Sequence, residues 1–328
     1  MSGPGPLATR TLDRCLGCGS SDLAPLPLRY EFRGSFPLVA CRRCGLRFLA
    51  VQPAGAALAE LYAPEYFERD FRCGRSESPY AREDAFREEN RALLDAFERL
   101  TPARMPPGSR ALLEVGCAGG WLLRDARARG WEARGVELAP AAVAHARALG
   151  LEVFEGDLLD ARLPGSRFDL VYMGDVLEHL PDSRAALDEI ARVLRPGGHL
   201  YLRGPITTHS LARRLALAVY GAAGGTIVLR EPPYHLWEFT PGPLRALVER
   251  AGLEVTSLRQ SKIQPGRPHG RKNALERALL AGIDALNLPL TRLFNVAGDR
   301  VVLVARRPAG DPAAPRAAGA APAVTSPR

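Results

Sequence analysis

The chain has 328 residues, of which 46% are hydrophobic and 24% are charged, and its formal net charge at pH 7 is +8. This length can bury a full core and is long for one domain, so we expect one main globular domain with smaller additions. No run of 18 or more uncharged apolar residues marks a certain membrane span, and the opening MSGPGPLATR lacks the apolar segment of a secretory signal. We therefore expect a cytoplasmic protein.

The basic residues are spread along the chain and do not form one block. There are 44 Lys and Arg residues against 36 Asp and Glu residues, and nearly all of the basic ones are Arg. A dispersed excess of this kind is typical of a solvated surface, whereas phosphate binding favours a clustered stripe. On charge alone, nucleic acid is not the expected partner.

Four of the six cysteines form two CxxCG pairs near the start of the chain: Cys15, Cys18, Cys41 and Cys44. In a cytosolic chain such pairs indicate metal ligands before disulfides. Two CxxC turns at the ends of a hairpin complete a tetrahedral site of four thiolates, the signature of a zinc ribbon. Because the protein fills all four positions, we expect a structural zinc in a ribbon spanning residues 1–50.

Residues 51–105 follow as a helical connecting segment. A short helix is predicted after Pro53, and an amphipathic helix over 82–100, where apolar side chains recur at helical spacing between charges. A proline-rich break then leads into the main domain, at 106–307. The Ala- and Pro-rich end of the chain, 308–328, has no apolar periodicity and is expected to be disordered.

Strands and helices alternate through the main domain. The apolar pattern predicts strands at 111–115, 132–136, 152–155, 168–173, 199–203, 253–258 and 301–306, with helical patterns between the first five. This order is typical of an α/β fold: a Rossmann-like, doubly wound, seven-stranded and mostly parallel sheet. The small zinc ribbon and the helical segment precede it.

The turn after the first of these strands, in ALLEVGCAGGWLL, faces the ligand crevice of such a sheet. It lacks the GK[ST] ending of a phosphate-binding P-loop and the GxGxxG spacing of a dinucleotide fingerprint. It does permit a close backbone approach, and Glu114 before it can accept a hydrogen bond from a cationic ligand. An acid at the tip of the second strand, Glu137, is placed to accept the two hydroxyls of a ribose.

The spacing E-x-G-x-A-x-G resembles motif I of the class I S-adenosylmethionine-dependent methyltransferases, in which all three small residues are usually glycine. Alanine is tolerable at Ala118 if the local φ is negative. The later segments EGDLLD, FDLVYMGDVLEHLPD, LRPGGHLYL and YHLWEFTPGPLRALVERAGLEV follow the same family in order. The resemblance is greatest to the methyltransferase type 23 group, many of whose members carry a similar ribbon, and it spans about residues 15–258.

This resemblance implies S-adenosyl-L-methionine as cofactor. It places the methionine part at Glu114, Gly116 and Gly120, the ribose at Glu137 and the adenine at Asp157. The full set implied for cofactor binding is Glu114, Gly116, Ala118, Gly120, Glu137, Leu138, Asp157, Leu158 and Asp175.

Two histidines are candidate general bases for an acceptor hydroxyl, since histidine has a suitable unperturbed pKa. His179 follows the fourth strand of the main domain and could equally cap or pack beside the cofactor pocket, whereas His235 lies among aromatic residues typical of an acceptor pocket wall. In ubiquinone-pathway O-methyltransferases, which the EHL triplet is similar to, such residues have been linked to a divalent metal. Two adjacent ligands do not specify a metal site.

The leading hypothesis is a small-molecule O-methyltransferase acting on a secondary metabolite, a sugar or an envelope precursor. One alternative is an RNA methyltransferase that grips its substrate with the ribbon, and another is a cofactor-binding adaptor without turnover. The apolar stretch at 206–229, within an insertion at 206–232, is interpreted as a cap over the acceptor or as a peripheral membrane contact. The apolar stretch at 275–293 could join it or mediate a homodimer.

Overall fold

The computed structural model describes residues 5–61, 84–101, 110–262, 282 and 287–310. Much of the predicted helix at 275–293 and nearly all of the predicted disordered tail lie outside the described residues. Within the described ranges, no helix combines the length and the hydropathy that crossing a membrane requires.

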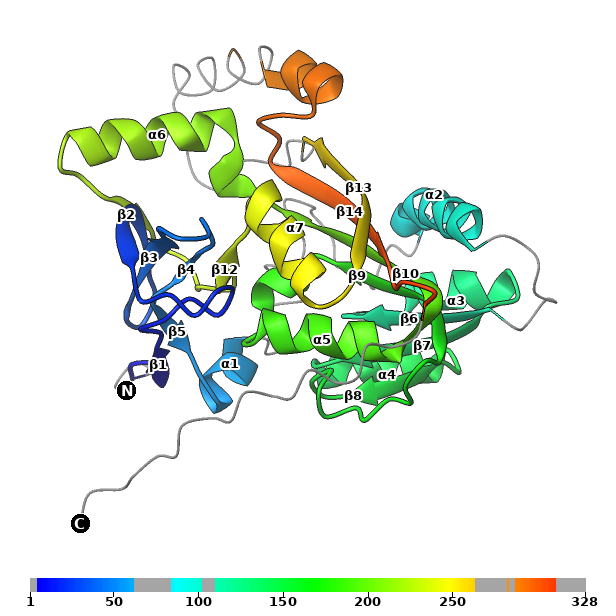
Figure 1. The fold of residues 1–328 in the computed structure, drawn as a ribbon. Coiled ribbons are helices and arrows are strands. Elements are labelled where there is room, and N and C mark those ends of the chain that lie inside the picture. The colour runs from blue at the N-terminus through cyan, green and yellow to red at the C-terminus, as the bar shows by residue number, and fades with distance from the viewer. Residues whose placement is uncertain (1–4, 62–83, 102–109, 263–281, 283–286, 311–328) are drawn as a thin grey trace.

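Seven strands form the central sheet, in the spatial order β13-β14-β10-β9-β6-β7-β8 (Figure 1). Their bounds are β6 Ala111–Val115, β7 Glu132–Glu137, β8 Glu152–Glu155, β9 Phe168–Gly174, β10 Leu194–Pro205, β13 Glu254–Ser261 and β14 Arg300–Arg306. The five strands from β10 to β8 run parallel, whereas β14 is antiparallel to both of its neighbours. The predicted Rossmann-like, mostly parallel sheet is confirmed, with all seven strands at the expected positions.

Helices cover both faces of this sheet. They are α2 Asp84–Leu100, α3 Trp121–Ala128, α4 Pro140–Ala148, α5 Ser183–Val193 and α7 Pro241–Arg250. Successive residues of a strand point to opposite faces, so Leu113 in β6 packs into the core that contains α5 and α7, while Leu112 packs into the core that contains α2, α3 and α4. An apolar run such as ALLEV therefore becomes a strand that is buried on both sides.

A second sheet carries the cysteine pairs and has the order β11-β2-β3-β4-β12. Its strands are β2 Leu23–Glu31, β3 Ser35–Cys41, β4 Arg47–Leu49, β11 Ile227–Leu229 and β12 Trp237–Glu238. The strands β1 Thr9–Thr11 and β5 Val51–Pro53 pair beside it, and the short helix α1 Ala56–Leu61 follows. Since β11 pairs with β2 and β12 pairs with β4, two distant parts of the chain build this cysteine-bearing sheet together.

The segment between β10 and β11 crosses the top of this sheet in Figure 1. It contains the 3-10 turn η4 Thr207–His209 and α6 Leu211–Ala222, which packs on β2. Leu217 is the buried apolar residue of α6, whereas Leu215 and Val219 are more than half exposed, at 56% and 57%. Whether this exposed face caps an acceptor or lies on a membrane stays a prediction.

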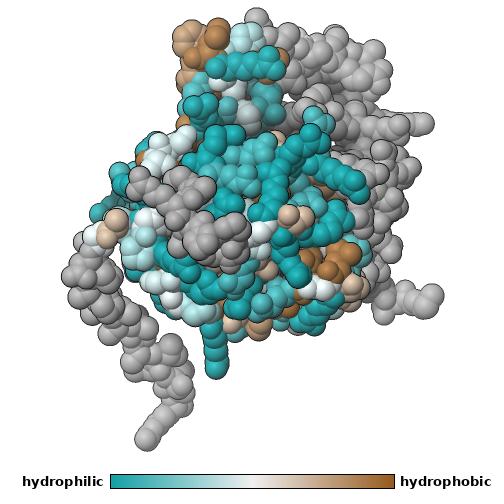
Figure 2. All heavy atoms as spheres, turned by 90° about the vertical axis from the view of Figure 1, so that its right-hand side faces the viewer, coloured by the Kyte–Doolittle hydropathy of each residue, from teal (hydrophilic) through white to brown (hydrophobic). Residues whose placement is uncertain are grey.

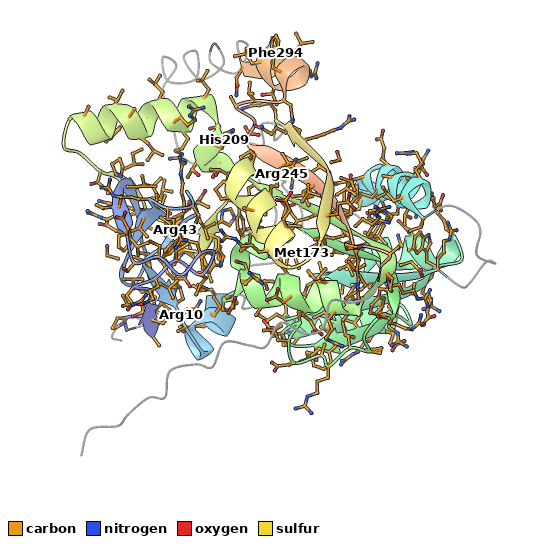
Figure 3. The ribbon with its side chains drawn as sticks, viewed as in Figure 1. Arg10, Arg43, Met173, His209, Arg245 and Phe294 are labelled. Atoms are coloured by element: carbon orange, nitrogen blue, oxygen red, sulfur yellow. The ribbon has the colours of Figure 1, made fainter. Side chains whose placement is uncertain are left out.

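The cysteine-bearing sheet is fixed to the central domain through polar contacts. Arg10 donates to Gln52 Oε1 at 2.7 Å and also to the carbonyl oxygen of Pro181. On the same side, Trp237 Nε1 donates to the carbonyl oxygen of Leu180 at 2.7 Å. Figure 3 shows Arg10 on β1, beside the lower part of this sheet, and the fully buried Met173 inside the central domain. These contacts converge just after strand β9, where the predicted His179 lies.

Candidate functional site

The turn after β6 lies at the carboxyl edge of the central sheet, where α/β folds bind their ligands. Gly116 and Gly120 have φ values of 73° and 81°, in the left-handed region. A Cβ atom on Gly116 would lie 2.3 Å from Val176 Cγ2, and one on Gly120 would lie 2.4 Å from Leu151 Cδ1. Both positions therefore require glycine for backbone conformation and for space.

Ala118 corrects one expectation of the sequence analysis. Its φ is 45°, so the negative φ under which alanine would fit without strain is not what the structure has. The left-handed region costs an alanine about 1–2 kcal/mol. Ala118 is held there because its N–H donates to Glu137 Oε2 at 2.9 Å.

Glu137 ends β7 and organises this loop. Its second oxygen, Oε1, accepts from the N–H of Ala139 at 2.9 Å, and the carboxylate is only 8% exposed. Burial raises the pKa of Glu137, and the backbone N–H donors only partly oppose that rise. Glu137 thus fixes the backbone of this loop through two hydrogen bonds. The next residue, Leu138, turns 39% of its surface to solvent.

Glu114, one residue before the end of β6, carries a buried carboxylate with an unused oxygen. The residue is 7% exposed, and its Oε2 has no hydrogen-bond partner among the described residues. Burial and the nearby charge of Glu137 raise its pKa well above the usual range, although Arg203 opposes this. An unsatisfied buried carboxylate is costly unless a donor or a cation reaches it. The ammonium group of a methionine moiety fits that requirement.

The predicted adenine residues follow β8, beside Glu137. The N–H of Gly156 donates to the carbonyl oxygen of Glu137 at 2.9 Å, which brings the two strand ends together. Asp157 Oδ1 accepts from the N–H of Leu159 at 2.9 Å, and Leu158 is buried at 2% exposure. The ends of β6, β7 and β8 therefore place Glu114, Glu137 and Asp157 along one edge of the sheet.

Asp175 comes directly after β9 at the same edge, with φ 55°. Its carboxylate is ion-paired with Arg300 and lies 4.0 Å from Arg203, which also pairs with Glu89 of α2. The sequence analysis named Asp175 but not its two arginine partners. Arg203 was recognisable as a basic residue at the end of a predicted strand, whereas the approach of Arg300 depends on β14 lying beside β10.

The two predicted histidines meet at this edge. His179 ends the 3-10 turn η3 Leu177–His179, and its ring lies 4.9 Å from the ring of His235 in an edge-on arrangement. His179 Nδ1 donates to the carbonyl oxygen of Tyr234 at 2.9 Å, since a carbonyl can only accept. Burial and the neighbouring His235 lower the pKa of His179 to about 3. His179 is therefore neutral at physiological pH.

The pKa of His235 moves in the opposite direction. Burial alone would lower it, but the carboxylates of Glu238, Glu178 and Asp175 outweigh burial and raise it. Its Nδ1 lies 3.9 Å from Glu238 Oε1, and the side chain is 29% exposed. Of the two rings, His235 is better placed to gain a proton near neutral pH.

Glu178 is the third member of this cluster. It is 2% exposed, its Oε1 has no hydrogen-bond partner among the described residues, and burial raises its pKa to about 8. The side-chain nitrogen and carboxylate oxygen atoms of Glu178, His179 and His235 lie within 4.8 Å of one another. At this spacing the protonation of each group influences that of the others.

The sequence of the chain is similar to a known family and to several named proteins. The profile of the Methyltransf_23 family, described as a methyltransferase domain, matches residues 83–258. The chain belongs to this family. A ubiquinone biosynthesis O-methyltransferase from Xanthomonas axonopodis pv. citri is 33% identical over 178 residues, which cover 52% of this chain and 73% of that protein. One from Xanthomonas campestris pv. campestris is 36% identical over 175 residues, covering 50% and 71%.

A solved structure of an S-adenosylmethionine-dependent methyltransferase from Archaeoglobus fulgidus has a TM-score of 0.44 to this chain at 18% identity. The similarity covers 69% of this chain and 98% of that one. The family match and the named relatives identify the chain as an S-adenosylmethionine-dependent methyltransferase enzyme.

The methyltransferase carries its four paired cysteines in one cluster. All four Sγ atoms lie within 4.8 Å of one another, with Cys15 to Cys44 and Cys18 to Cys41 each at 3.5 Å. Although burial pushes the pKa of Cys41 upward, hydrogen bonds from the backbone of Cys44 and from Cys18 bring it down to about 7. Burial instead raises the pKa of Cys15. Four thiols this close suit a tetrahedral metal ion.

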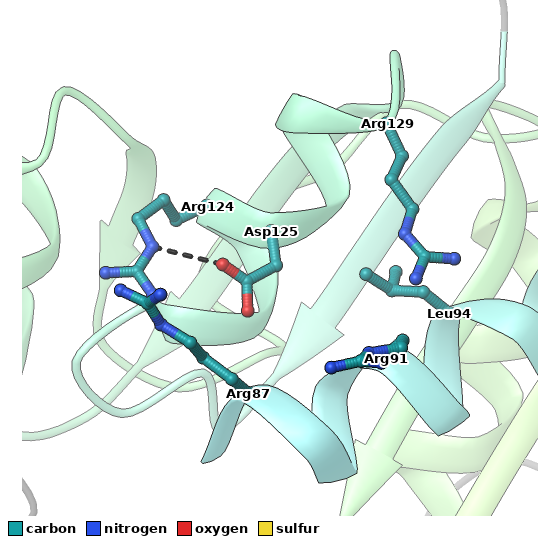
Figure 4. A pocket seen from close by; sticks show the side chains of 6 residues that line it. All are labelled: Arg87, Arg91, Leu94, Arg124, Asp125 and Arg129. Atoms are coloured by element: carbon teal, nitrogen blue, oxygen red, sulfur yellow. Dashed lines mark hydrogen bonds and ion pairs between the residues drawn. The ribbon is translucent and has the colours of Figure 1, made fainter. Parts of the chain in front are cut away.

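A separate open depression of about 550 Å³ lies between α2 and α3, outside the glycine loop (Figure 4). Its lining residues are Arg87, Arg91, Leu94, Arg124, Asp125 and Arg129. Arg124 pairs with Asp125 at 3.1 Å, and Arg129 pairs with Asp95 at 2.6 Å. Figure 2 shows that this side of the methyltransferase is mostly hydrophilic. Arg124 and Arg129 are each paired with a carboxylate, which is typical of a solvated helix surface.

Proposed function

We propose that this methyltransferase transfers a methyl group to a hydroxyl oxygen of a small-molecule acceptor. The observation that carries the proposal is the contact between His179 and His235 at the carboxyl edge that also holds the glycine loop. Relatives at 33% and 36% identity are named O-methyltransferases. An oxygen acceptor needs a base to remove its proton, and this edge supplies a histidine.

The cofactor roles follow from the loop. Glu114 would accept a hydrogen bond from the methionine ammonium group, which matches its unused Oε2. Glu137 would accept the ribose hydroxyls with the lone pairs that its two backbone donors leave free. Asp157 and Leu158 would lie along the adenine, and Leu138 and Asp175 would complete the edge. Gly116, Ala118 and Gly120 would let the backbone approach closely.

When bound, S-adenosylmethionine supplies a methyl group on an electrophilic sulfonium. His235 would take the proton that the acceptor hydroxyl loses when its oxygen gains the methyl group. His179 is neutral and donates to the carbonyl oxygen of Tyr234, and its ring would keep the ring of His235 in place by packing edge-on against it. The products are a methyl ether and the demethylated cofactor, with the proton left on His235.

Calorimetric titration with S-adenosylmethionine and with its demethylated product tests the cofactor roles. Glu137→Gln and Glu114→Gln are expected to weaken both ligands at least tenfold, since each loses an anionic acceptor. Glu152→Gln is the matched control, because Glu152 is an exposed residue at the opposite end of β8. Unchanged affinity in both loop variants would contradict the assigned roles.

The acceptor class is tested with isotope-labelled methyl transfer to phenols, sugars and polyketide-like hydroxyls, with amines and bulk transfer RNA run alongside. We expect label on oxygen of a small molecule. Label on RNA, with binding that weakens steeply as salt rises, would instead support the RNA methyltransferase alternative. Cofactor binding with no transfer to any class would support the adaptor alternative.

We also propose a structural zinc at Cys15, Cys18, Cys41 and Cys44. The support is that all four positions of a tetrahedral site are filled by thiols, which leaves no open position for substrate. Metal analysis of purified protein should give one zinc per chain, lost in Cys18→Ser. Finding no zinc in folded, active protein would contradict this assignment.

A further inference from the structure

The backbone on both sides of His235 is tied down. Tyr234 accepts the hydrogen bond from His179, and the N–H of Leu236 donates to the carbonyl oxygen of Glu178 at 2.9 Å. The carbonyl oxygen of Leu236 accepts from the N–H of Leu49 at 3.0 Å, at the end of β4. The histidine is therefore held between the turn η3 and the cysteine-bearing sheet.

A buried carboxylate lies next to it. Glu238, in β12, is 4% exposed and sits opposite Arg47 of β4 in the register. Tyr30 donates its hydroxyl to Glu238 Oε1 at 3.2 Å, and Thr207 donates its hydroxyl to Oε2 at 3.1 Å. These two hydroxyls fix the carboxylate without neutralising it. The same Oε1 atom is the one that lies 3.9 Å from His235 Nδ1.

We propose that Glu238 and Tyr30 are positioning residues of the acceptor site: Glu238 orients the ring of His235, and Tyr30, from the N-terminal cysteine-bearing sheet, holds Glu238. This inference rests on the proposed role of His235 as base. A carboxylate 3.9 Å from a ring nitrogen stabilises the imidazolium that forms when His235 accepts a proton.

The charges around His235 agree with that role. Glu178 and Asp175 face it from η3 and from the end of β9, the neutral ring of His179 stacks edge-on, and Glu238 faces it from β12. Tyr30 is 6% exposed and its pKa is raised by burial and by Glu238, so it remains a protonated donor. The cysteine-bearing sheet is thus a wall of the acceptor site and contributes a side chain to its hydrogen-bond network.

The test follows the ring of each of the six histidines by NMR as pH is varied. Glu238→Gln keeps an acceptor for Tyr30 or Thr207 and removes the charge, so the midpoint of His235 should fall by about one pKa unit, a tenfold change in its proton affinity. Tyr30→Phe removes only the hydroxyl donor and should move the midpoint in the same direction by less. The midpoint of His199, in β10 of the central sheet, should not move.

Two matched variants serve as controls. Glu254→Gln changes an exposed carboxylate of β13, and Tyr201→Phe removes a hydroxyl from a tyrosine packed against Phe97. Thr207→Val carries the test if Glu238→Gln does not fold, since it removes the donor to the other carboxylate oxygen. A His235 midpoint that stays within experimental error in the folded variants would overturn the proposal.

The pH dependence of methyl transfer provides an independent test. With an accepted hydroxyl substrate, the acidic limb of the kcat/KM profile should move to lower pH in Glu238→Gln, in step with the His235 midpoint, whereas a merely structural defect would lower the rate at every pH. Ring titration needs no turnover. A shifted His235 midpoint without transfer to any hydroxyl would therefore refute the proposed O-methylation while leaving the positioning of His235 supported.

Discussion

Gly116→Ala tests the glycine loop with a control built into the same chain. Gly116 and Gly150 both have φ 73°, but a Cβ atom on Gly116 meets Val176 Cγ2 at 2.3 Å, whereas one on Gly150 meets nothing within 4 Å. An alanine in the left-handed region costs about 1–2 kcal/mol, of which the less flexible unfolded chain returns about 0.4–1 kcal/mol. Overpacking against a stiff, β-branched side chain adds about 1–3 kcal/mol.

Gly150→Ala should therefore lower the free energy of unfolding by about 1 kcal/mol, and Gly116→Ala by about 2–4 kcal/mol. Urea denaturation followed by circular dichroism measures both. Calorimetry at a temperature where both variants are folded should show S-adenosylmethionine binding kept in Gly150→Ala and weakened at least tenfold in Gly116→Ala. Equal destabilisation of the two, or full affinity in Gly116→Ala, would refute the argument that this turn needs glycine for space.

Three further predictions follow from the same edge. Ala118→Gly removes the strain at φ 45° and should raise the free energy of unfolding by about 0.5–1 kcal/mol; a loss of stability in urea would contradict the strain. Glu114→Gln should stabilise the cofactor-free protein above pH 5 while weakening cofactor binding. A carboxyl whose pKa is higher in the folded than in the unfolded protein costs stability as pH rises, so the variant should have the higher melting temperature at pH 8. His179 is neutral because its pKa is lowered to about 3, so it contributes stability above pH 6.5 that is lost as pH falls. His179→Gln should therefore lose less stability on acidification. The same dependence of melting temperature on pH in the variant and the parent protein would refute this.

Short-range patterns were enough to place the glycine loop. The strand ALLEV, the small residues after it and the acid Glu137 at the next strand tip all lie in continuous segments whose geometry follows from the parallel βαβ unit. Ala118 shows the limit of that reasoning. Its positive φ is set by a hydrogen bond to Glu137, 19 residues away, and residue type alone did not reveal it.

The histidine pair depended on contacts between distant segments. His179 and His235 could each be picked from their neighbours in sequence, but their contact needs the chain to return past η3 after β11. Glu238 and Tyr30 were not picked at all, because their hydrogen bond joins residues 208 positions apart. Arg300 likewise reaches Asp175 only because β14 inserts antiparallel beside β10.

The sequence by itself determined the class of fold and all seven strands of the central sheet, because periodicity and turn chemistry are local properties that short segments express wherever they lie. The family was indicated by the resemblance of the ordered motifs to known methyltransferases. Tertiary structure decided that β11 and β12 join the cysteine-bearing sheet, and hence that this sheet stands against the histidine pair. Strand pairing across long stretches of chain depends on which edges the completed core leaves available, and no local pattern encodes that choice.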